Sequence, residues 1–295
     1  MKLALPKISI PSFSFKKKAT TGLSIQLTDK FLRVLKLNKE EKPEFPPIEE
    51  IWEDLSDVEK KNKLSEIVSK YNLTGSSVVT CVPADEGLLK FQKLPSKMSH
   101  KDLMEALNWF INVETSQIKE NTVHDYYFIE SKPEDKYIRV VVAIARTDFI
   151  NKLKDIIEGS GLKIGVVDYE VISIINYGLY KKLPVPFSIL YVDYYEAILA
   201  YYSDTGISYN KINFNYKYYM ENKDKDIFNS FVIETRNTVV INELSNIYVG
   251  GPIIADEEAM EEIMVNLPVL GILDLEELPP NFFIPYILSV RGLEE

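Results

Sequence analysis

The sequence predicts an α/β protein of two lobes, with a small β-α-β-β-α-β domain inserted into the first lobe. Segments with the alternation of strands are interleaved with segments that carry apolar residues on one helical face. A strand hairpin that begins at Gly22 has an echo in a second hairpin that begins at Ile189. A compact series of strands and helices separates the two hairpins, and this series is the predicted insertion.

Length and composition are consistent with this architecture. The chain has 295 residues, which is enough for a substantial core and for two or more domains. Its 46% hydrophobic and 26% charged residues are ordinary for a soluble globular protein. The net charge of −10 argues against a nucleic-acid partner, which would require a basic surface. The single cysteine, Cys81, has no disulfide partner within the chain and is interpreted as a buried strand residue.

The first 19 residues form a leader in this interpretation. No apolar run approaches the roughly 18 residues of a transmembrane helix, and Pro6, Lys7 and Pro11 interrupt any signal-peptide core. Apolar and polar residues alternate before the lysine run 16–18. Two interpretations stay open, a weak attachment to a membrane surface and a loosely ordered leader.

Strand and helix patterns predict the domain boundaries. The first large domain covers residues 20–83 and 165–185, with a hairpin over 20–37, a proline-rich connection over 39–50, a helix over 57–71 and a strand over 78–82. The inserted domain covers residues 84–164, with its last strand over 162–167. A helix over 171–180 leads out of it. The second large domain covers residues 186–295, with three strands between 188 and 214, helices over 227–243 and 256–265, and a strand over 247–249.

Two turns carry the strongest functional signal. The first reads Gly22-Leu23-Ser24-Ile25-Gln26, and the second contains Asp193-Tyr194-Tyr195. Both resemble the phosphate-binding turns of actin-type ATPases, which usually read Asp-x-Gly. Only glycine lets backbone N–H groups come close to phosphate, so the side chains of Gln26 and Tyr195 predict crowding at that place.

The order of further motifs resembles the PilM family, actin-like proteins of type IV pilus assembly that are related to FtsA. The first motif is the hairpin at residues 22–26, and the last is a closing helix at residues 287–293. Between them, residues 91–103 contain the pairs Leu-Pro, Met-Ser and Asp-Leu in that order. Three strand-like segments follow at residues 123–126, 140–147 and 161–168. The resemblance covers the chain from about residue 20 onwards. It implies an actin-like, ribonuclease H-like fold.

The resemblance also implies a function and partners. It implies a non-catalytic cytoplasmic adaptor at the inner face of the inner membrane, held there through its partners. The cytoplasmic N-terminal peptide of a PilN-like membrane protein would bind in a groove between residues 20–80 and 88–168, by backbone hydrogen bonds and apolar pockets. A pilus assembly ATPase is a further expected partner, and no nucleic acid and no cofactor are expected.

The departures from the family's nucleotide motif define the candidate site. In the family the first-turn aspartate helps to hold the water shell of the metal, and Ser24 offers no carboxylate. Asp193, Gly250 and Gly251 match the family's nucleotide positions, whereas Ser24, Gln26 and Tyr195 do not. Asp193 is alternatively a strand-end residue, and the glycine pair is alternatively a strand-to-helix turn. The region before residue 247 is short, which predicts a reduced clamping subdomain.

Other chemistry is not indicated. The two histidines, His100 and His124, lack ligand neighbours at metal-site spacing. Eight tyrosines between residues 194 and 219 predict either an adhesive face or the packing of a sheet. Two rival functions stay open. One is an ATP-dependent actin-like or sugar-kinase-like enzyme, and the other is a cytoplasmic component of a type II secretion platform.

Overall fold

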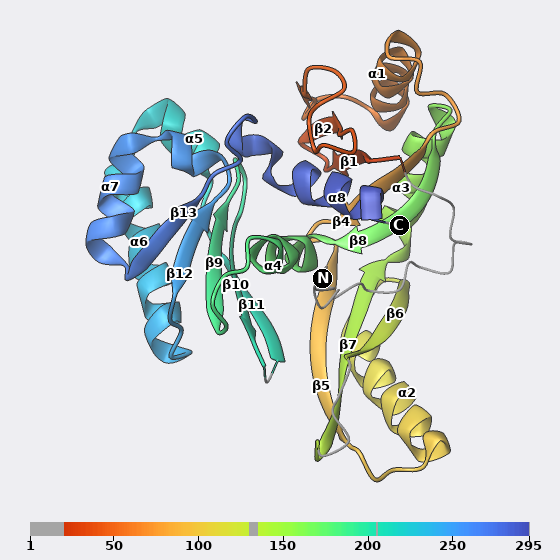
Figure 1. Ribbon diagram of the computed structural model, residues 1–295, viewed down its shortest axis with the longest axis vertical. Coiled ribbons are helices and arrows are strands. Elements are labelled where there is room, and N and C mark those ends of the chain that lie inside the picture. The colour runs from red at the N-terminus through yellow and green to blue at the C-terminus, as the bar shows by residue number, and fades with distance from the viewer. Residues whose placement is uncertain (1–20, 130–134, 205, 295) are drawn as a thin grey trace. The chain divides into compact units, whose positions relative to one another are not determined.

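The computed structural model describes residues 21–129, 135–204 and 206–294, so the predicted leader lies outside the described residues (Figure 1). The chain forms two compact units. We call residues 21–172 with 288–294 the N-terminal unit, and residues 173–287 the C-terminal unit. No helix of the described residues combines the length and the apolar character that crossing a membrane requires.

The N-terminal unit is built on a mixed five-stranded sheet. The strand order is β3-β2-β1-β4-β8, with β1, β2 and β3 antiparallel and β4 and β8 parallel to β1. The strands are β1 (Leu23–Leu27), β2 (Phe31–Lys36), β3 (Ile48–Ile51), β4 (Ser77–Val82) and β8 (Lys163–Tyr169). Cys81 is buried in β4, as predicted. The strand β3 was missed, because its charged and half-exposed residues looked like part of the proline-rich connection.

Two helices of this unit contact each other, α1 (Asp57–Lys70) and α3 (Thr147–Gly159). Helix α1 begins with a capping box. The side chain of Ser56 accepts from the N–H of Glu59, and the Glu59 carboxylate accepts from the N–H of Ser56. The buried face of α3 consists of Phe149, Leu153, Ile156 and Ile157, at the spacing that one face of a helix requires.

The inserted segment forms a separate three-stranded sheet. Its order is β5-β7-β6, with all pairs antiparallel, and α2 (His100–Ser116) packs on one face. The strands are β5 (Gly87–Pro95), β6 (Thr122–Ile129) and β7 (Tyr137–Arg146). One expectation is corrected here. The strand expected to complete the inserted domain is β8, which pairs in parallel with β4 and so belongs to the five-stranded sheet.

The C-terminal unit repeats the topology of the first sheet. Its order is β11-β10-β9-β12-β13, again a three-stranded antiparallel meander followed by two parallel strands. The strands are β9 (Phe187–Val192), β10 (Ala197–Ser203), β11 (Gly206–Ile212), β12 (Ile247–Gly250) and β13 (Val269–Leu273). The predicted echo between the two hairpins is therefore confirmed, and it extends to all five strands of each sheet.

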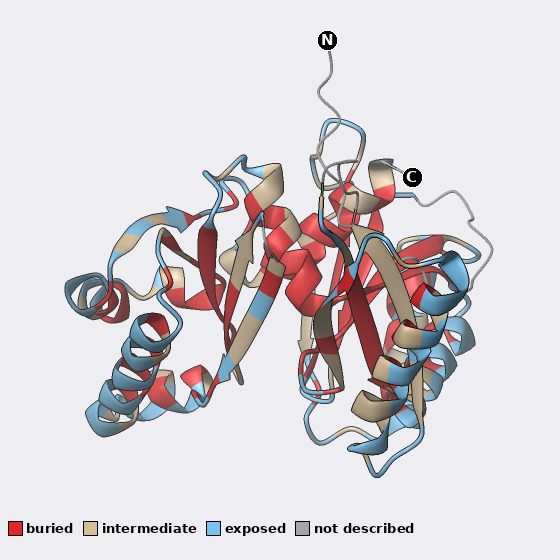
Figure 2. Ribbon diagram, turned by 90° about the horizontal axis from the view of Figure 1, so that it is seen from below, coloured by how far each residue is buried: buried red, intermediate tan, exposed pale blue. Residues whose placement is uncertain are grey.

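Helices complete the C-terminal unit. They are α5 (Tyr216–Asn222), α6 (Lys225–Ile241), α7 (Glu257–Asn266) and the 3-10 turns η1 (Pro252–Ala255) and η2 (Pro280–Phe282). Helices α4 (Glu170–Tyr180) and α8 (Phe283–Glu294) have residues in both units. Figure 2 shows buried strands and helices with exposed outer faces. Within the tyrosine cluster, Tyr216 and Tyr219 are buried against Phe214 and Phe228, whereas Tyr218 is exposed.

The boundaries of the two compact units differ from the predicted domain boundaries. Residues 173–185 belong to the C-terminal unit, and residues 288–294 belong to the N-terminal unit. The last turns of α8 pack on the first sheet, where Gly292 contacts Val79 and the backbone of Gly22. The division into domains at the predicted residues stays a prediction.

Candidate functional site

Ser24 lies in the middle of β1 and is fully buried. The hydroxyl of Ser289, in α8, donates a hydrogen bond to Ser24 Oγ at 2.7 Å. The Ser24 hydroxyl in turn lies 3.4 Å from the carbonyl oxygen of Leu35 on the neighbouring strand. Ser24, the residue expected at the position of the family's aspartate, therefore binds the protein's own closing helix.

Gln26, two residues further along β1, is also buried. Its side-chain N–H donates to Glu170 Oε1 at 3.1 Å, and its oxygen accepts from the guanidinium of Arg33 at 3.1 Å. Both partners are themselves fully buried. The amide thus lies between a carboxylate and a guanidinium, and it hydrogen-bonds to both.

The bonds around Gln26 extend into a longer chain of contacts. Arg33 Nε donates to Glu49 Oε1 at 2.6 Å, and Glu170 Oε2 accepts from the backbone N–H of Ala84 at 3.0 Å. We call Glu49, Arg33, Gln26 and Glu170 the buried polar chain. It joins β3, β2 and β1 to the start of α4. Buried charges are tolerated when they are paired and hydrogen-bonded, as they are here.

Sequence reasoning missed three members of this chain, Glu49, Arg33 and Glu170. A signal was present, because Arg33 interrupts the apolar strand Phe31–Lys36 and Glu170 begins an apolar helix. A charge at a buried position needs a partner. The sequence does not say which residue that partner is, since Gln26 and Glu170 are 144 positions apart.

A second buried ion pair joins the closing helix to the first sheet. The guanidinium of Arg291 in α8 binds the carboxylate of Asp168 in β8, whose side chain is 1% exposed. The other Asp168 oxygen accepts from the N–H of Tyr169 at 2.8 Å. This carboxylate is therefore neutralised by an arginine within the protein.

Asp193 is buried at the end of β9, in the turn of the second hairpin. Its Oδ2 accepts from the hydroxyl of Tyr191 at 2.5 Å, and its Oδ1 accepts from the N–H of Tyr194 at 2.7 Å. Its own N–H donates to the carbonyl of Glu196 at 2.9 Å and closes the turn. These are the bonds expected of a strand-end residue.

Tyr195 lies half-buried at the tip of the same turn. The ammonium of Lys217, in α5, donates to its hydroxyl at 3.0 Å and lies 5.4 Å from the ring centroid. The backbone N–H of Lys217 also donates to the carbonyl of Tyr194 at 2.8 Å. Tyr195, the residue expected at the position of the family's glycine, therefore connects the turn to α5.

Gly250 and Gly251 lie at the end of β12, and the structure brings them against the second turn. Gly251 has a φ of +90°, and a β-carbon there would lie 2.6 Å from the carbonyl oxygen of Val192. A β-carbon at Gly250 would lie 2.7 Å from the ring of Phe283. Packing within this unit therefore requires both glycines, whether or not a ligand binds.

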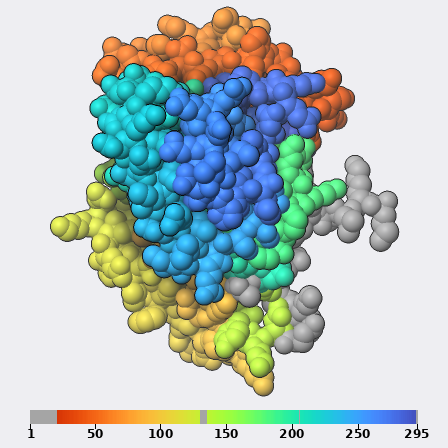
Figure 3. Space-filling view, turned by 90° about the vertical axis from the view of Figure 1, so that its left-hand side faces the viewer, coloured from red at the N-terminus to blue at the C-terminus, as the bar shows by residue number. Residues whose placement is uncertain are grey.

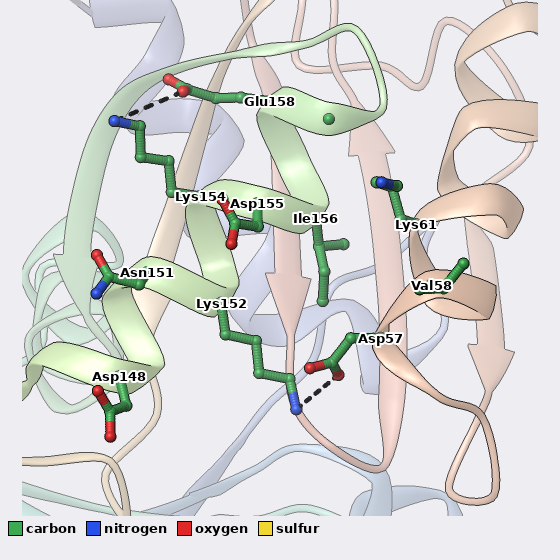
Figure 4. A pocket seen from close by; sticks show the side chains of 11 residues that line it. Asp57, Val58, Lys61, Asp148, Asn151, Lys152, Lys154, Asp155, Ile156 and Glu158 are labelled. Atoms are coloured by element: carbon green, nitrogen blue, oxygen red, sulfur yellow. Dashed lines mark ion pairs between the residues drawn. The ribbon is translucent and has the colours of Figure 1, made fainter.

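The N-terminal unit also has an open cavity of about 610 Å³ between α1 and α3 (Figure 4). Lys152 lies at one end, where its ammonium contacts Asp29 at 2.5 Å and Asp57 at 2.9 Å. Burial opposes the charge on Lys152, but these two carboxylates raise its pKa above the usual value. Burial also acts to raise the pKa of Asp29, yet its contacts with Lys152 and Lys60 lower that pKa overall.

The chemistry available to these residues is limited. In residues 21–129, 135–204 and 206–294, no three His, Cys, Asp or Glu side chains are grouped so that they could hold a metal ion. Ser24 and Gln26 share β1, and Asp193 and Tyr195 share a turn beside the glycine pair. The side chains at these positions hydrogen-bond to neighbouring protein groups, which is the chemistry of a structural site.

Comparisons with known proteins place the fold. No protein-family model and no curated protein matches the chain. A PilM–PilN type IV pilus biogenesis complex matches with a TM-score of 0.74 at 15% identity, over 94% of this chain and 100% of that chain. A protein with an actin-like ATPase fold from Bacteroides thetaiotaomicron matches with a TM-score of 0.55 at 14% identity, over 90% and 95%.

The cytoplasmic domain of EpsL, an inner-membrane component of the type II secretion system of Vibrio cholerae, also matches. Its TM-score is 0.55 at 12% identity, over 92% of this chain and 94% of that domain. At these identities the likeness shows the fold. The predicted actin-like fold class and the predicted resemblance to PilM are confirmed at that level.

Proposed function

We propose that this chain is a non-catalytic cytoplasmic adaptor of a type IV pilus or related assembly machine. The observation that carries the proposal is the buried polar chain around Gln26. Where an actin-type ATPase has a glycine, this protein has an amide that hydrogen-bonds to Glu170 and Arg33. Phosphoryl transfer depends on close positioning of phosphate and metal, and this arrangement removes the backbone approach that positioning requires.

The proposed ligand is the cytoplasmic N-terminal peptide of a PilN-like inner-membrane protein. The likeness to the PilM–PilN complex supports this choice of partner. Binding would hold the adaptor at the inner face of the inner membrane. The expected groove lies between residues 20–80 and 88–168, which belong to one compact unit. An extended peptide would gain backbone hydrogen bonds and would place alternate side chains in apolar pockets.

The three-stranded sheet offers a suitable surface for such a peptide. Tyr126 and Phe128 on β6 pack towards α2, so the intervening Tyr127 points to the opposite face. Tyr127 and Phe91 are both only half-buried. In the part of the chain that the structure describes, strand β6 is also an edge of its sheet, and an edge strand has backbone groups available for one more strand.

A binding titration tests the proposal. A labelled synthetic peptide with the cytoplasmic N-terminal sequence of a PilN-like protein should bind with a micromolar or lower dissociation constant. Tyr127→Glu should weaken binding at least tenfold, because it puts a charge on the proposed apolar face. Trp109→Glu is the matched control, since Trp109 is an exposed aromatic residue on α2. Absence of binding, or equal weakening by both variants, would overturn the proposal.

One alternative is an ATP-dependent enzyme. Asp193 and the glycine pair are retained at the family's nucleotide positions, and this retention favours the alternative. Calorimetry with ATP and magnesium separates the two functions. Micromolar binding that disappears in Asp193→Ala would support the enzyme, whereas the adaptor predicts no heat of binding. A place in a type II secretion platform, which the likeness to EpsL supports, would instead appear as binding to a peptide of that system.

A further inference from the structure

The C-terminal unit presents an exposed apolar surface at the edge of its sheet. Strand β13 is the last strand of the order β11-β10-β9-β12-β13, so within residues 21–129, 135–204 and 206–294 no strand pairs with its outer edge. Leu270 and Ile272 on this strand are 61% and 47% exposed. Met264 and Val265, at the end of α7, are 55% and 78% exposed. We call Leu270, Ile272 and the outer edge of β13 the β13 surface.

Edge strands usually carry protection against pairing with other chains. Lysines, prolines or bulges on the strand are the common devices. Within β13 the sequence is Val-Leu-Gly-Ile-Leu, which contains no charge and no proline. A register shift between Val269 and Gly271 in the pairing with β12 is the one such device on this strand. Apolar patches that stay exposed on a folded protein often mark interaction sites. The β13 surface therefore has the features of a docking edge.

The charged residues of α7 and of the segment after β13 are acidic, and among them Glu276 is paired with Lys181 at 3.8 Å. Residues 237–290 contain no lysine and no arginine. Glu257, Glu258 and Glu261 on α7 are exposed, as are Asp274 and Glu276 after β13. Among the residues that the structure describes, the α7 glutamates have no lysine or arginine within ion-pair distance. Residues from α5 to α7, cyan to blue, form much of the face turned to the viewer in Figure 3.

The negative charge near the β13 surface indicates which kind of partner would bind there. Two copies of the chain joined through β13 would bring two acidic surfaces together, and like charges repel. A basic partner instead gains attraction at the rim of the same patch. We propose that β13 docks an extended segment of another protein in which apolar residues alternate with lysine or arginine. The backbone of that segment would pair with the edge of β13, and its apolar side chains would cover Leu270 and Ile272.

This second docking surface is independent of the peptide groove proposed in the N-terminal unit. It would let one adaptor bind two partners, each on its own compact unit. The two proposals therefore fail separately. A variant of β13 should leave binding of the PilN-like peptide unchanged, and Tyr127→Glu should leave binding at β13 unchanged.

A synthetic peptide tests the inference on the full-length protein. The probe is a labelled Ser-Lys-Ile-Lys-Ile-Lys-Val-Ser peptide, and its comparator has glutamate in place of each lysine. We expect salt-dependent binding of the lysine peptide alone. The double variant Leu270→Lys with Ile272→Lys should weaken it at least tenfold. The control Val240→Lys with Ile241→Lys adds the same charge at exposed sites on α6 and should change binding less than threefold.

Hydrogen exchange locates the bound peptide. Saturating lysine peptide should slow amide exchange within residues 269–273, because an added strand bonds to the free edge. Unchanged exchange in this segment would overturn the inference, and so would equal weakening by the two double variants. A wild-type dimer in sedimentation that Leu270→Lys with Ile272→Lys dissociates would also overturn it, by assigning the surface to a second copy.

Discussion

Replacing Gln26 by glycine tests whether the buried polar chain holds the first sheet together. Gln26→Gly restores the residue that an actin-type turn usually has. It also removes the hydrogen bonds of Gln26 to Glu170 and Arg33, which are each 3.1 Å long. Both partners are charged and fully buried. The variant is therefore expected to weaken the protein without creating a nucleotide site.

The magnitude follows from the contacts that are lost. A hydrogen bond to a charged group contributes about 1.5–3 kcal/mol. Glu170 keeps the N–H of Ala84, and Arg33 keeps Glu49, so the low end applies to each bond. Two such bonds amount to about 3 kcal/mol, and glycine within a strand costs about 0.5–1 kcal/mol more. The free energy of unfolding should fall by about 4 kcal/mol in all.

Urea denaturation followed by tryptophan fluorescence measures this loss. The chain has two tryptophans, Trp52 and Trp109, and both lie in the N-terminal unit with Gln26. Trp52 is buried, and its indole N–H donates to the carbonyl of Thr28 at 2.9 Å. With a slope of about 2 kcal/mol per molar urea, the midpoint should fall by about 2 M.

Two control variants separate the causes. Gln26→Met keeps the volume and should still cost about 3 kcal/mol, because the hydrogen bonds are lost. Gln92→Gly places glycine in the half-exposed edge strand β5 and should cost about 1 kcal/mol. A Gln26→Gly midpoint equal to that of Gln92→Gly would refute the role of the buried polar chain. Micromolar binding of ATP and magnesium to Gln26→Gly would refute the argument that this site has lost its chemistry.

Three further variants test other contacts. Arg291→Met leaves the buried Asp168 without its cation and should lower the free energy of unfolding of the N-terminal unit by about 3–5 kcal/mol, measured in urea. Gly251→Ala should lower the free energy of unfolding of the C-terminal unit by about 2–4 kcal/mol, because the new β-carbon clashes with Val192 and the φ is positive. Circular dichroism of the tyrosines measures this loss. The lowered pKa of Asp29 adds stability above its unfolded pKa of about 4, and this stability should be lost as the pH falls through the folded value. Lys152→Met should reduce this loss of stability at low pH. The measurement is the midpoint temperature of thermal unfolding at each pH from 3 to 6.

Each of these variants has a matched control. Arg139→Met breaks a more exposed ion pair with Asp135 and should cost less than about 1 kcal/mol. For Gly251→Ala the control is Gly75→Ala. Gly75 has a similar φ of +77°, but a β-carbon there would have no atom within 4 Å, so this variant measures the backbone strain without the clash. Lys154→Met removes an exposed cation from the same helix as Lys152 and should leave the acid transition unchanged. A variant that behaves like its control contradicts the contact that it tests.

Local patterns predicted most of the helices and strands. Helix α1, helix α7 and the short buried strand β4 each have a signal within a few residues. The echo of the two hairpins also lay in the sequence, and it predicted the repeated sheet. Assigning β8 to the inserted sheet was wrong, because strand pairing is a long-range choice. The residues of β8 fit either sheet, and only packing selects β4 as the neighbour.

The sequence by itself predicted that the two turns lack a complete phosphate site, because Ser24, Gln26 and Tyr195 stand where the motif that they resemble has aspartate or glycine. It could not determine what these side chains do instead. The tertiary structure decided that Gln26 joins Arg33 to Glu170 and that Ser24 binds Ser289, 265 positions away. In a strand, side chains alternate between the two faces of the sheet, so the sequence alone shows on which face a residue lies. Its partner is chosen by whichever distant segment the fold brings against that face.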